Sequence, residues 1–327
     1  MARILAERPI DTASPLRDID PAAFHDLLDR LDRAAYRFVT VTPASHAHVV
    51  ARPDRRQAGS LRDIFGWSLP FDPGKLPPPL FASLGRAGII VERDDGRFVS
   101  RVRVSSVHDT LFLHSAYPTT ARDAVFLGPD SYRFADLILA RMAPPGPDAR
   151  ILDYAAGAGV GGITAAIAHR QARLTLADIN PDALFLAAIN AARAGLDADV
   201  VHAATPTDVA GTFDLIVTHP PFMIDPGARA YRDGGDLHGA RLSLDWVVAG
   251  AGKLAPGGRL ILHTGVAIVD GEDVLRPHLE GALAGTGCSL WYHELDPDIF
   301  GEELATPAYA DVDRIAAVGA CVVRHDR

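Results

Sequence analysis

From residue 150 onward, the sequence alternates short apolar runs with longer segments of helical periodicity. The apolar runs are 151–154, 174–178, 200–202, 213–218 and 258–263, and the segments between them with helical spacing are 161–169, 181–194 and 242–254. Strands that alternate with helices at this spacing form a parallel sheet with helices on both faces. The sequence therefore predicts an α/β, doubly wound fold, which binds ligands beyond the carboxyl ends of its strands.

The first 110 residues have a different pattern. Residues 21–37 carry apolar side chains at helical spacing after Asp20 and Pro21, and residues 78–91 include a second such run. A turn at Asp94-Asp95-Gly96 separates two strand-like runs, 89–93 and 97–104. Helices followed by a hairpin predict a smaller α+β domain with a winged-helix-like arrangement. We therefore expect an accessory or substrate domain at 1–110 and a ligand-binding domain at 111–327.

The junction between these two regions is interpreted as a linker followed by a helix. Residues 110–127 have the pattern of a linker that contains a strand. The segment Tyr132–Met142 then predicts a helix, with Asp130 or Ser131 as its N-terminal cap.

Composition excludes several classes of protein. The chain has 327 residues, and its apolar runs are far shorter than the roughly 20 residues that cross a bilayer. The N-terminus lacks the apolar core of a signal peptide, so we expect a cytoplasmic protein without a membrane partner. Two cysteines, Cys288 and Cys321, are too few for a disulfide scaffold or a four-cysteine zinc site. The histidines lack ligand spacing, and we therefore expect no metal.

Charge is distributed unevenly along the chain. The net charge is −9, of which residues 1–110 contribute +2 and the remainder −11. Because phosphate neutralisation supplies much of the affinity for nucleic acid, this balance makes RNA less favoured than a small-molecule or protein partner. The sequence does not indicate an oligomeric state. If RNA is bound, the candidate residues are five arginines of the N-terminal domain, Arg52, Arg55, Arg56, Arg101 and Arg103.

The first strand of the C-terminal domain runs into a loop of glycine and alanine between Asp153 and Gly162. Small residues let a ligand lie against the backbone. Gly157, Gly159 and Gly162 also have the spacing of a dinucleotide-binding loop, so this motif alone leaves a nicotinamide-dependent oxidoreductase open. Asp153 would crowd a pyrophosphate there, whereas it could anchor a cationic ligand. Asp178, at the end of the second strand, could accept hydrogen bonds from the ribose hydroxyls of either cofactor.

The fourth strand leads directly into the tetrad His219-Pro220-Pro221-Phe222. Together with the glycine loop, this order of motifs resembles class I S-adenosylmethionine-dependent methyltransferases that carry an (Asn/Asp/Ser)-Pro-Pro-(Tyr/Phe/Trp) tetrad. Within that class it is similar to the small-domain group, which includes the release-factor glutamine and rRNA guanine N-methyltransferases. The resemblance covers about residues 125–270. It implies a Rossmann-like fold, S-adenosyl-L-methionine as cofactor, and N-methylation of a small molecule or protein side chain, with rRNA or tRNA as the alternative acceptor.

The resemblance also implies which residues form the site. The catalytic residues are those of the tetrad, His219, Pro220, Pro221 and Phe222. The cofactor-binding residues are Asp130, Ser131, Tyr132, Asp153, Ala155, Gly157, Gly159, Asp178, Ile179, Ala203, Ala204 and His219. Family members usually have an acidic residue after the third strand, where this chain has His202-Ala203-Ala204-Thr205. We therefore expect main chain and apolar packing around the adenine.

The tetrad departs from the family pattern at its first residue. Two prolines fix the backbone, so that a carbonyl and the first side chain point at one spot and accept hydrogen bonds from the acceptor. His219 replaces the usual Asn, Asp or Ser, and an imidazole with a pKa of about 6.5 can also take a proton. His219 is therefore interpreted as a general base for an amine or hydroxyl acceptor. The alternative is that it caps the strand, and that the Pro220 carbonyl alone positions the acceptor.

Two polar segments follow the tetrad. Residues 231–239 are rich in glycine and typical of a mobile loop over a substrate, with Tyr231, Arg232 and His238 as candidate substrate-binding residues. Residues 294–303 contain five acidic side chains. Such a run is usually a solvated face. If it lies over the cleft, it would favour a cationic acceptor such as an amine or guanidine.

Overall fold

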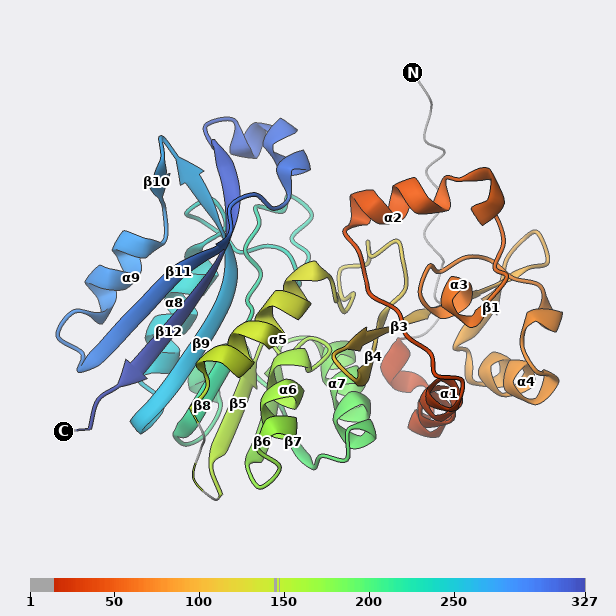
Figure 1. Cartoon of the computed structure of the whole chain (residues 1–327), viewed down its shortest axis with the longest axis horizontal. Helices are drawn as coiled ribbons and strands as arrows, with labels where there is room; N and C mark the ends of the chain where they lie inside the picture. The colour runs from red at the N-terminus through yellow and green to blue at the C-terminus, as the bar shows by residue number, and fades with distance from the viewer. Residues whose placement is uncertain (1–14, 144–145, 147, 327) are drawn as a thin grey trace.

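The computed structural model describes residues 15–143, 146 and 148–326, and its main sheet has the strand order β11-β12-β9-β8-β5-β6-β7 (Figure 1). The strands are β5 (Arg150–Tyr154), β6 (Arg173–Asp178), β7 (Ala198–His202), β8 (Phe213–Thr218), β9 (Leu254–Val269), β11 (Cys288–Asp296) and β12 (Arg314–Arg324), and β10 (Glu272–Asp273) pairs with β9. Strands β5 to β9 are parallel, which confirms the predicted fold. The antiparallel pairing of β12 with both of its neighbours was not predicted. Chain order reverses between β5 and β8, where sheets of this kind bind ligands.

Helices cover both faces of the sheet. Those on one face are α5 (Pro129–Arg141), α6 (Val160–Ala168) and α7 (Pro181–Arg193), and those on the other are α8 (Arg241–Ala251) and α9 (Arg276–Leu283). Because strand side chains alternate between faces, Ile151 packs in the core under α5–α7, while Leu152 packs in the core under α8 and α9. Single 3-10 turns connect these elements, at η1 (Leu16–Asp18), η2 (Pro53–Arg55), η3 (Pro73–Lys75), η4 (Pro206–Asp208), η5 (Gly301–Ala305) and η6 (Pro307–Tyr309).

The N-terminal module consists of helices and two hairpins. The helices are α1 (Pro21–Arg33), α2 (Pro43–Val50), α3 (Leu61–Phe65) and α4 (Pro78–Ala87), and the hairpins are β1 (Ile90–Glu92) with β2 (Phe98–Ser100) and β3 (Val102–Val107) with β4 (Thr110–Ser115). Helix α1 begins as predicted. Asp20 accepts a hydrogen bond from the backbone N–H of Ala22 at 2.9 Å, and Pro21 occupies the first turn, where its missing N–H is not needed.

The module and the sheet share one continuous core. Phe24 of α1 meets Phe185 of α7 edge to face, with ring centroids 5.7 Å apart. The buried Asn190 amide of α7 accepts the N–H of Leu113 at 2.8 Å and donates to the carbonyls of Leu113 and Ala158 at 3.0 and 2.9 Å. Asn190 therefore joins β4 to the glycine loop. The domain boundary expected at residue 110 lies in the β3–β4 hairpin and stays a prediction.

Several element boundaries differ from those expected, and three of them have an identifiable cause. Helix α5 begins at Pro129 with Gly128 as its N-cap, so Asp130 and Ser131 lie inside the first turn rather than at the cap. The run 97–104 forms two strands, because β2 pairs with β1 whereas β3 pairs with β4. Strand β9 extends to Val269 instead of residue 263, because β12 continues to pair with it beyond the end of β8. None of the helices in the described ranges is both long and apolar enough to cross a membrane.

Replacing Asn190 with alanine should lower the free energy of unfolding by about 3 kcal/mol, because buried main-chain groups of Leu113 and Ala158 lose their partners. Urea unfolding followed by circular dichroism measures this change. The control is Ala192→Ser, at an exposed position of the same helix, which should change stability by less than about 0.5 kcal/mol. Equal midpoints for the two variants would contradict a structural role for the amide.

Candidate active site

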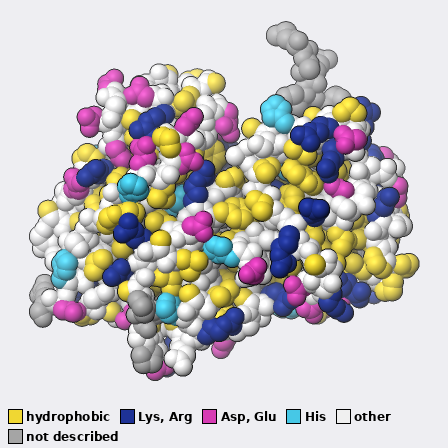
Figure 2. Space-filling model, in the orientation of Figure 1, with side chains coloured by type: hydrophobic (Ala, Val, Ile, Leu, Met, Phe, Trp, Pro, Cys, Tyr) yellow, Lys and Arg dark blue, Asp and Glu magenta, His cyan; other side chains and the backbone are white. Residues whose placement is uncertain are grey.

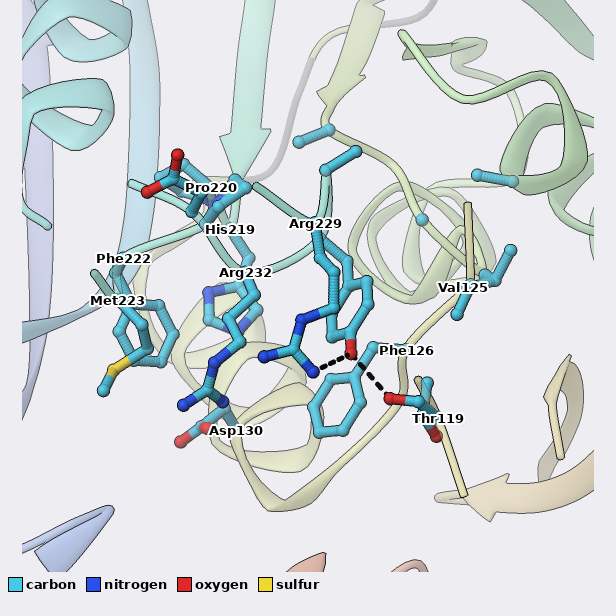
Figure 3. Close-up of a pocket in the computed structure, with 18 of the residues that line it drawn as sticks. Thr119, Val125, Phe126, Asp130, His219, Pro220, Phe222, Met223, Arg229 and Arg232 are labelled. Carbon is cyan, nitrogen blue, oxygen red and sulfur yellow. Dashed lines mark hydrogen bonds between the residues drawn. The ribbon is translucent and has the colours of Figure 1, made fainter. Parts of the chain in front are cut away.

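A cavity of about 790 Å³ opens where β5, β6 and β8 end (Figure 3). The glycine loop after β5 and the tetrad after β8 form two of its walls. The first turn of α5 and residues 117–126 form a third wall, and residues 228–233 and 300–303 complete the lining. Pro43 and Ala44 of the N-terminal module also line it. The site is therefore built from every part of the chain rather than from the sheet alone.

The glycine loop is held by the carboxylate of Asp178. This side chain accepts hydrogen bonds from the backbone N–H of Gly157 at 2.9 Å and of Asn180 at 2.8 Å. Burial raises the pKa of Asp178, and these N–H groups oppose the shift by favouring the charged form. Gly157 has a φ of +53°, and a Cβ built there would meet no other atom within 4 Å. The loop therefore leaves open space above its backbone.

His219 has a defined tautomer. Its Nδ1 lies 2.8 Å from the carbonyl oxygen of His263, which can only accept, so Nδ1 carries the proton. The Nε2 atom then presents a lone pair, and no residue in the described ranges forms a hydrogen bond with it. Burial lowers the pKa of His219, while the nearby carboxylate of Asp130 opposes this shift. The imidazole is therefore neutral at pH 7 and able to accept a proton.

The Phe222 ring is packed from three sides. It stacks near the His219 ring at 5.7 Å and meets Phe300 edge to face at 5.7 Å. A Cβ at Gly265 of β9 would come within 2.4 Å of this ring, so glycine is needed there for the close approach. This packing fixes the aromatic wall of the cavity beside the imidazole.

The loop after the tetrad, which includes Tyr231 and Arg232, is held by contacts with two separate segments that line the cavity. Arg232 forms an ion pair with Glu303 at 2.6 Å, which joins the loop to η5. The Tyr231 hydroxyl donates to the carbonyl of Thr119 at 2.6 Å and accepts from Arg229 at 3.2 Å (Figure 3). The Tyr231 ring also stacks on Phe126, with centroids 5.9 Å apart. The loop predicted to be mobile is thus held over the cavity.

The structure brings most of the predicted site residues together. Those that line the cavity are Asp130, Ser131, Ala155, Gly157, Asp178, Ile179, Ala204, His219, Pro220, Pro221, Phe222, Tyr231 and Arg232. Five others lie outside its lining, namely Tyr132, Asp153, Gly159, Ala203 and His238.

The first two of these residues point away from the cavity for identifiable reasons. The Tyr132 hydroxyl accepts the N–H of Thr40 at 2.8 Å, so this side chain joins α5 to the N-terminal module. Asp153 is buried under α6, where its carboxylate accepts the N–H of Gly162 at 2.7 Å. It therefore anchors the start of the helix through one oxygen and does not line the cavity.

The other three lie beneath or beside the site. Gly159 is the N-cap of α6 and lies between Ala158 and Val160, which line the cavity although Gly159 itself does not. Ala203 is buried, and its N–H donates to the carbonyl of Asp178 at 3.1 Å. His238 lies 3.2 Å from Asp311, on the outer side of the loop. We therefore assign none of the three a contact with cofactor or acceptor.

Several cavity residues were not predicted from the sequence. Phe126 and Thr119 precede α5, and Pro43 belongs to the N-terminal module. No local motif marks them, because only the packing of the module against the sheet brings them to the site. Glu302 and Glu303 lie in the acidic run that the sequence did single out, and the structure places both at the cavity.

Comparison with known proteins identifies the class. Residues 123–262 match the family model described as "Methyltransferase small domain". The chain is 33% identical over 166 residues to a release factor glutamine methyltransferase of Deinococcus radiodurans, covering 47% of this chain and 55% of that protein. It is 34% identical over 155 residues to a ribosomal RNA small subunit methyltransferase C of Pasteurella multocida, covering 47% and 42%. The chain thus spans about half the length of these curated relatives.

A similar solved structure is TrmN from Thermus thermophilus, at 20% identity and a TM-score of 0.42, covering 76% of this chain and 68% of that one. The family match is what identifies the domain. Residues 123–262 form a methyltransferase small domain of the class I S-adenosylmethionine-dependent type, as the resemblance implied. This match favours a methyltransferase over the nicotinamide alternative, and the cofactor of the class is S-adenosylmethionine.

The residues present fit this cofactor. Asp178 lies at the end of β6 and offers a carboxylate to a ribose, and Gly157 leaves room for a ligand against the backbone. The exposed side chain of Ile179 provides an apolar surface for a flat base. The lining includes five carboxylates, of Asp130, Asp178, Asp233, Glu302 and Glu303, against two guanidiniums, of Arg229 and Arg232, which suits a cation such as a sulfonium.

Replacing Asp178 with alanine should weaken binding of S-adenosylhomocysteine at least roughly tenfold, because the ribose contact and the anchor of Gly157 are lost together. Isothermal titration calorimetry measures this affinity. Asp199→Asn, at an exposed position on the neighbouring strand β7, is the control and should bind like the wild type. Unchanged affinity in the Asp178 variant would contradict this placement of the cofactor.

Asp153 predicts a pH dependence of stability. Burial raises the pKa of this carboxyl to about 7, so between its unfolded value of about 3.9 and pH 7 the folded state holds a proton that the unfolded state releases. Its contribution to stability should therefore be largest at low pH and decline as pH rises from 5 to 7, by up to roughly 1.4 kcal/mol per unit. Urea unfolding at several pH values should show a flatter profile for Asp153→Asn. A profile that is identical to wild type would contradict the assignment.

Proposed function

We propose that the protein transfers the methyl group of S-adenosylmethionine to a nitrogen atom of a small molecule or a protein side chain, and that the acceptor binds at the His219-Pro220-Pro221-Phe222 tetrad. The observation that carries this proposal is that the glycine loop and the tetrad open into one cavity. A cofactor on the loop would thereby be placed next to an acceptor at the tetrad. One relative is named for methylation of a release factor glutamine, whose side-chain amide offers a nitrogen, and the other for methylation of ribosomal RNA.

His219 supplies the acid–base chemistry in this proposal. The cofactor contributes a methyl carbon made electrophilic by its sulfonium. The acceptor nitrogen gives its lone pair to that carbon while the carbon–sulfur bonding pair returns to sulfur, and the proton on nitrogen passes to Nε2 of His219. The Pro220 carbonyl and the Phe222 ring hold the acceptor in line, and this positioning accounts for much of the rate enhancement. Asp130 then stabilises the imidazolium that is formed.

RNA is the less favoured acceptor. Arg101 and Arg103, two of the arginines expected to grip it, are buried and donate to the carbonyls of Gly88 and Gly66. Arg55 forms an ion pair with Asp63 at 2.7 Å. Lys and Arg side chains do gather over the N-terminal module on the right of Figure 2. The experiment below therefore also measures methyl transfer to RNA. A release factor or ribosomal RNA as acceptor would agree with the cytoplasmic location that the sequence predicts.

The test is methyl transfer from radiolabelled S-adenosylmethionine into cell extract, separated into small-molecule, protein and RNA fractions. His219→Ala should keep its affinity for S-adenosylhomocysteine within about threefold and lose at least roughly 100-fold in transfer rate, because it removes the general base. His219→Asn restores the family residue, which can accept a hydrogen bond but takes no proton. We expect it to remain impaired.

Two outcomes would contradict this account. Full activity of His219→Asn would show that the residue positions the acceptor without taking its proton. Label found in the RNA fraction alone would replace the proposed acceptor with RNA.

A further inference from the structure

We infer that the acceptor carries a positive charge, on an ammonium or guanidinium group, beside the nitrogen that is methylated. This inference rests on the proposed function and names the chemistry of its acceptor. The observations that support it concern the part of the cavity formed by residues 228–233 and 300–303, which we call the acceptor end. Residues 228–233 belong to the loop after the tetrad. Residues 300–303 lie outside the family-matched stretch 123–262.

Both guanidiniums at the acceptor end are already neutralised. Arg229 forms a two-point ion pair with Asp225, at 2.8 and 2.5 Å. Arg232 pairs with Glu303 at 2.6 Å. An anionic acceptor would therefore have to break one of these ion pairs before it found a cation.

The unmatched charge at the acceptor end is negative. Glu302 lines the cavity, and no cationic side chain in the described ranges pairs with it. Asp233 also lines the cavity, and its carboxylate accepts hydrogen bonds from the backbone N–H groups of Asp225 and Gly235, both at 3.4 Å. In Figure 2, acidic side chains gather at the upper left, over β10 and the segment that carries η5. Two carboxylates without a cation therefore face the space that the acceptor would occupy.

Aromatic rings complete a surface that suits an organic cation. Phe222, Phe300, Phe126 and Tyr231 all line the cavity, and a cation over an aromatic face is attracted by the ring's quadrupole. Phe300 has a φ of +53°, a conformation that is strained for a residue with a side chain and persists only when its surroundings enforce it. The Phe300 ring packs against Phe222, which helps to hold this backbone conformation. Glu302, two residues further along the chain, lines the cavity. Rings beside unpaired carboxylates favour an amine or guanidine over a phosphate.

The experiment measures binding of defined probes to protein that is saturated with S-adenosylhomocysteine. The cationic probes are agmatine, which carries an ammonium and a guanidinium, and a blocked Gly-Lys-Gln-Lys-Gly peptide. The anionic probe is the matching Gly-Glu-Gln-Glu-Gly peptide. Calorimetric titration should show binding of at least one cationic probe and at least roughly tenfold weaker binding of the anionic one. Tighter binding of agmatine would indicate a small amine, and tighter binding of the basic peptide a protein side chain.

Glu302→Gln is the decisive variant, because it removes charge with little change of shape. It should weaken the cationic probe roughly tenfold. Glu294→Gln, in which the lost carboxylate pairs with Arg314 at 3.0 Å and does not line the cavity, should leave binding unchanged. The inference is overturned if neither cationic probe binds, if the acidic peptide binds as tightly as the basic one, or if Glu302→Gln has no effect. Affinity for S-adenosylhomocysteine should be retained throughout, and its absence in the wild type would instead contradict the proposed function.

Discussion

The parallel pairing of β5 with β8 is the constraint on which the site depends. These strands are distant in sequence, yet Tyr154 lies opposite Thr218 at their carboxyl ends, and the Thr218 hydroxyl donates to the Tyr154 carbonyl at 2.8 Å. The glycine loop and the tetrad therefore begin side by side. Every other feature of the site adds to this junction, because it either holds one of the two motifs or covers the space between them.

Two kinds of interaction complete the arrangement. On the cofactor side, the Asp178 carboxylate holds the glycine loop through the N–H of Gly157. On the acceptor side, the His263 carbonyl fixes the His219 tautomer, and burial keeps the imidazole neutral. A neutral imidazole with a free Nε2 differs in function from the amide or carboxylate that the family usually carries there. In the function proposed above, this nitrogen takes the proton of an amine acceptor, which an amide at this position could not do.

Much of the fold and part of the site could be predicted from the sequence. The alternation of apolar runs and helical segments specified the parallel sheet, and Asp178 and His219 were found because motifs at strand ends converge by topology. Asp153 lies outside the cavity lining because a strand residue points to one face or the other, and here α6 covers its side chain. Tyr132 contacts the N-terminal module and Arg103 donates to Gly66 within that module, and no local pattern encodes either contact. Phe300 reaches the site only through the antiparallel strands that the sequence did not reveal.

A crystal structure with S-adenosylhomocysteine bound tests the central claim most directly, since that claim concerns where two motifs meet. We expect the ribose hydroxyls to lie on the Asp178 carboxylate and the sulfur atom to face His219 across the cavity. The space beyond the sulfur should be bounded by Phe222 and Glu302. A ligand whose sulfur points away from the tetrad, or which lies outside this cavity, would contradict the account.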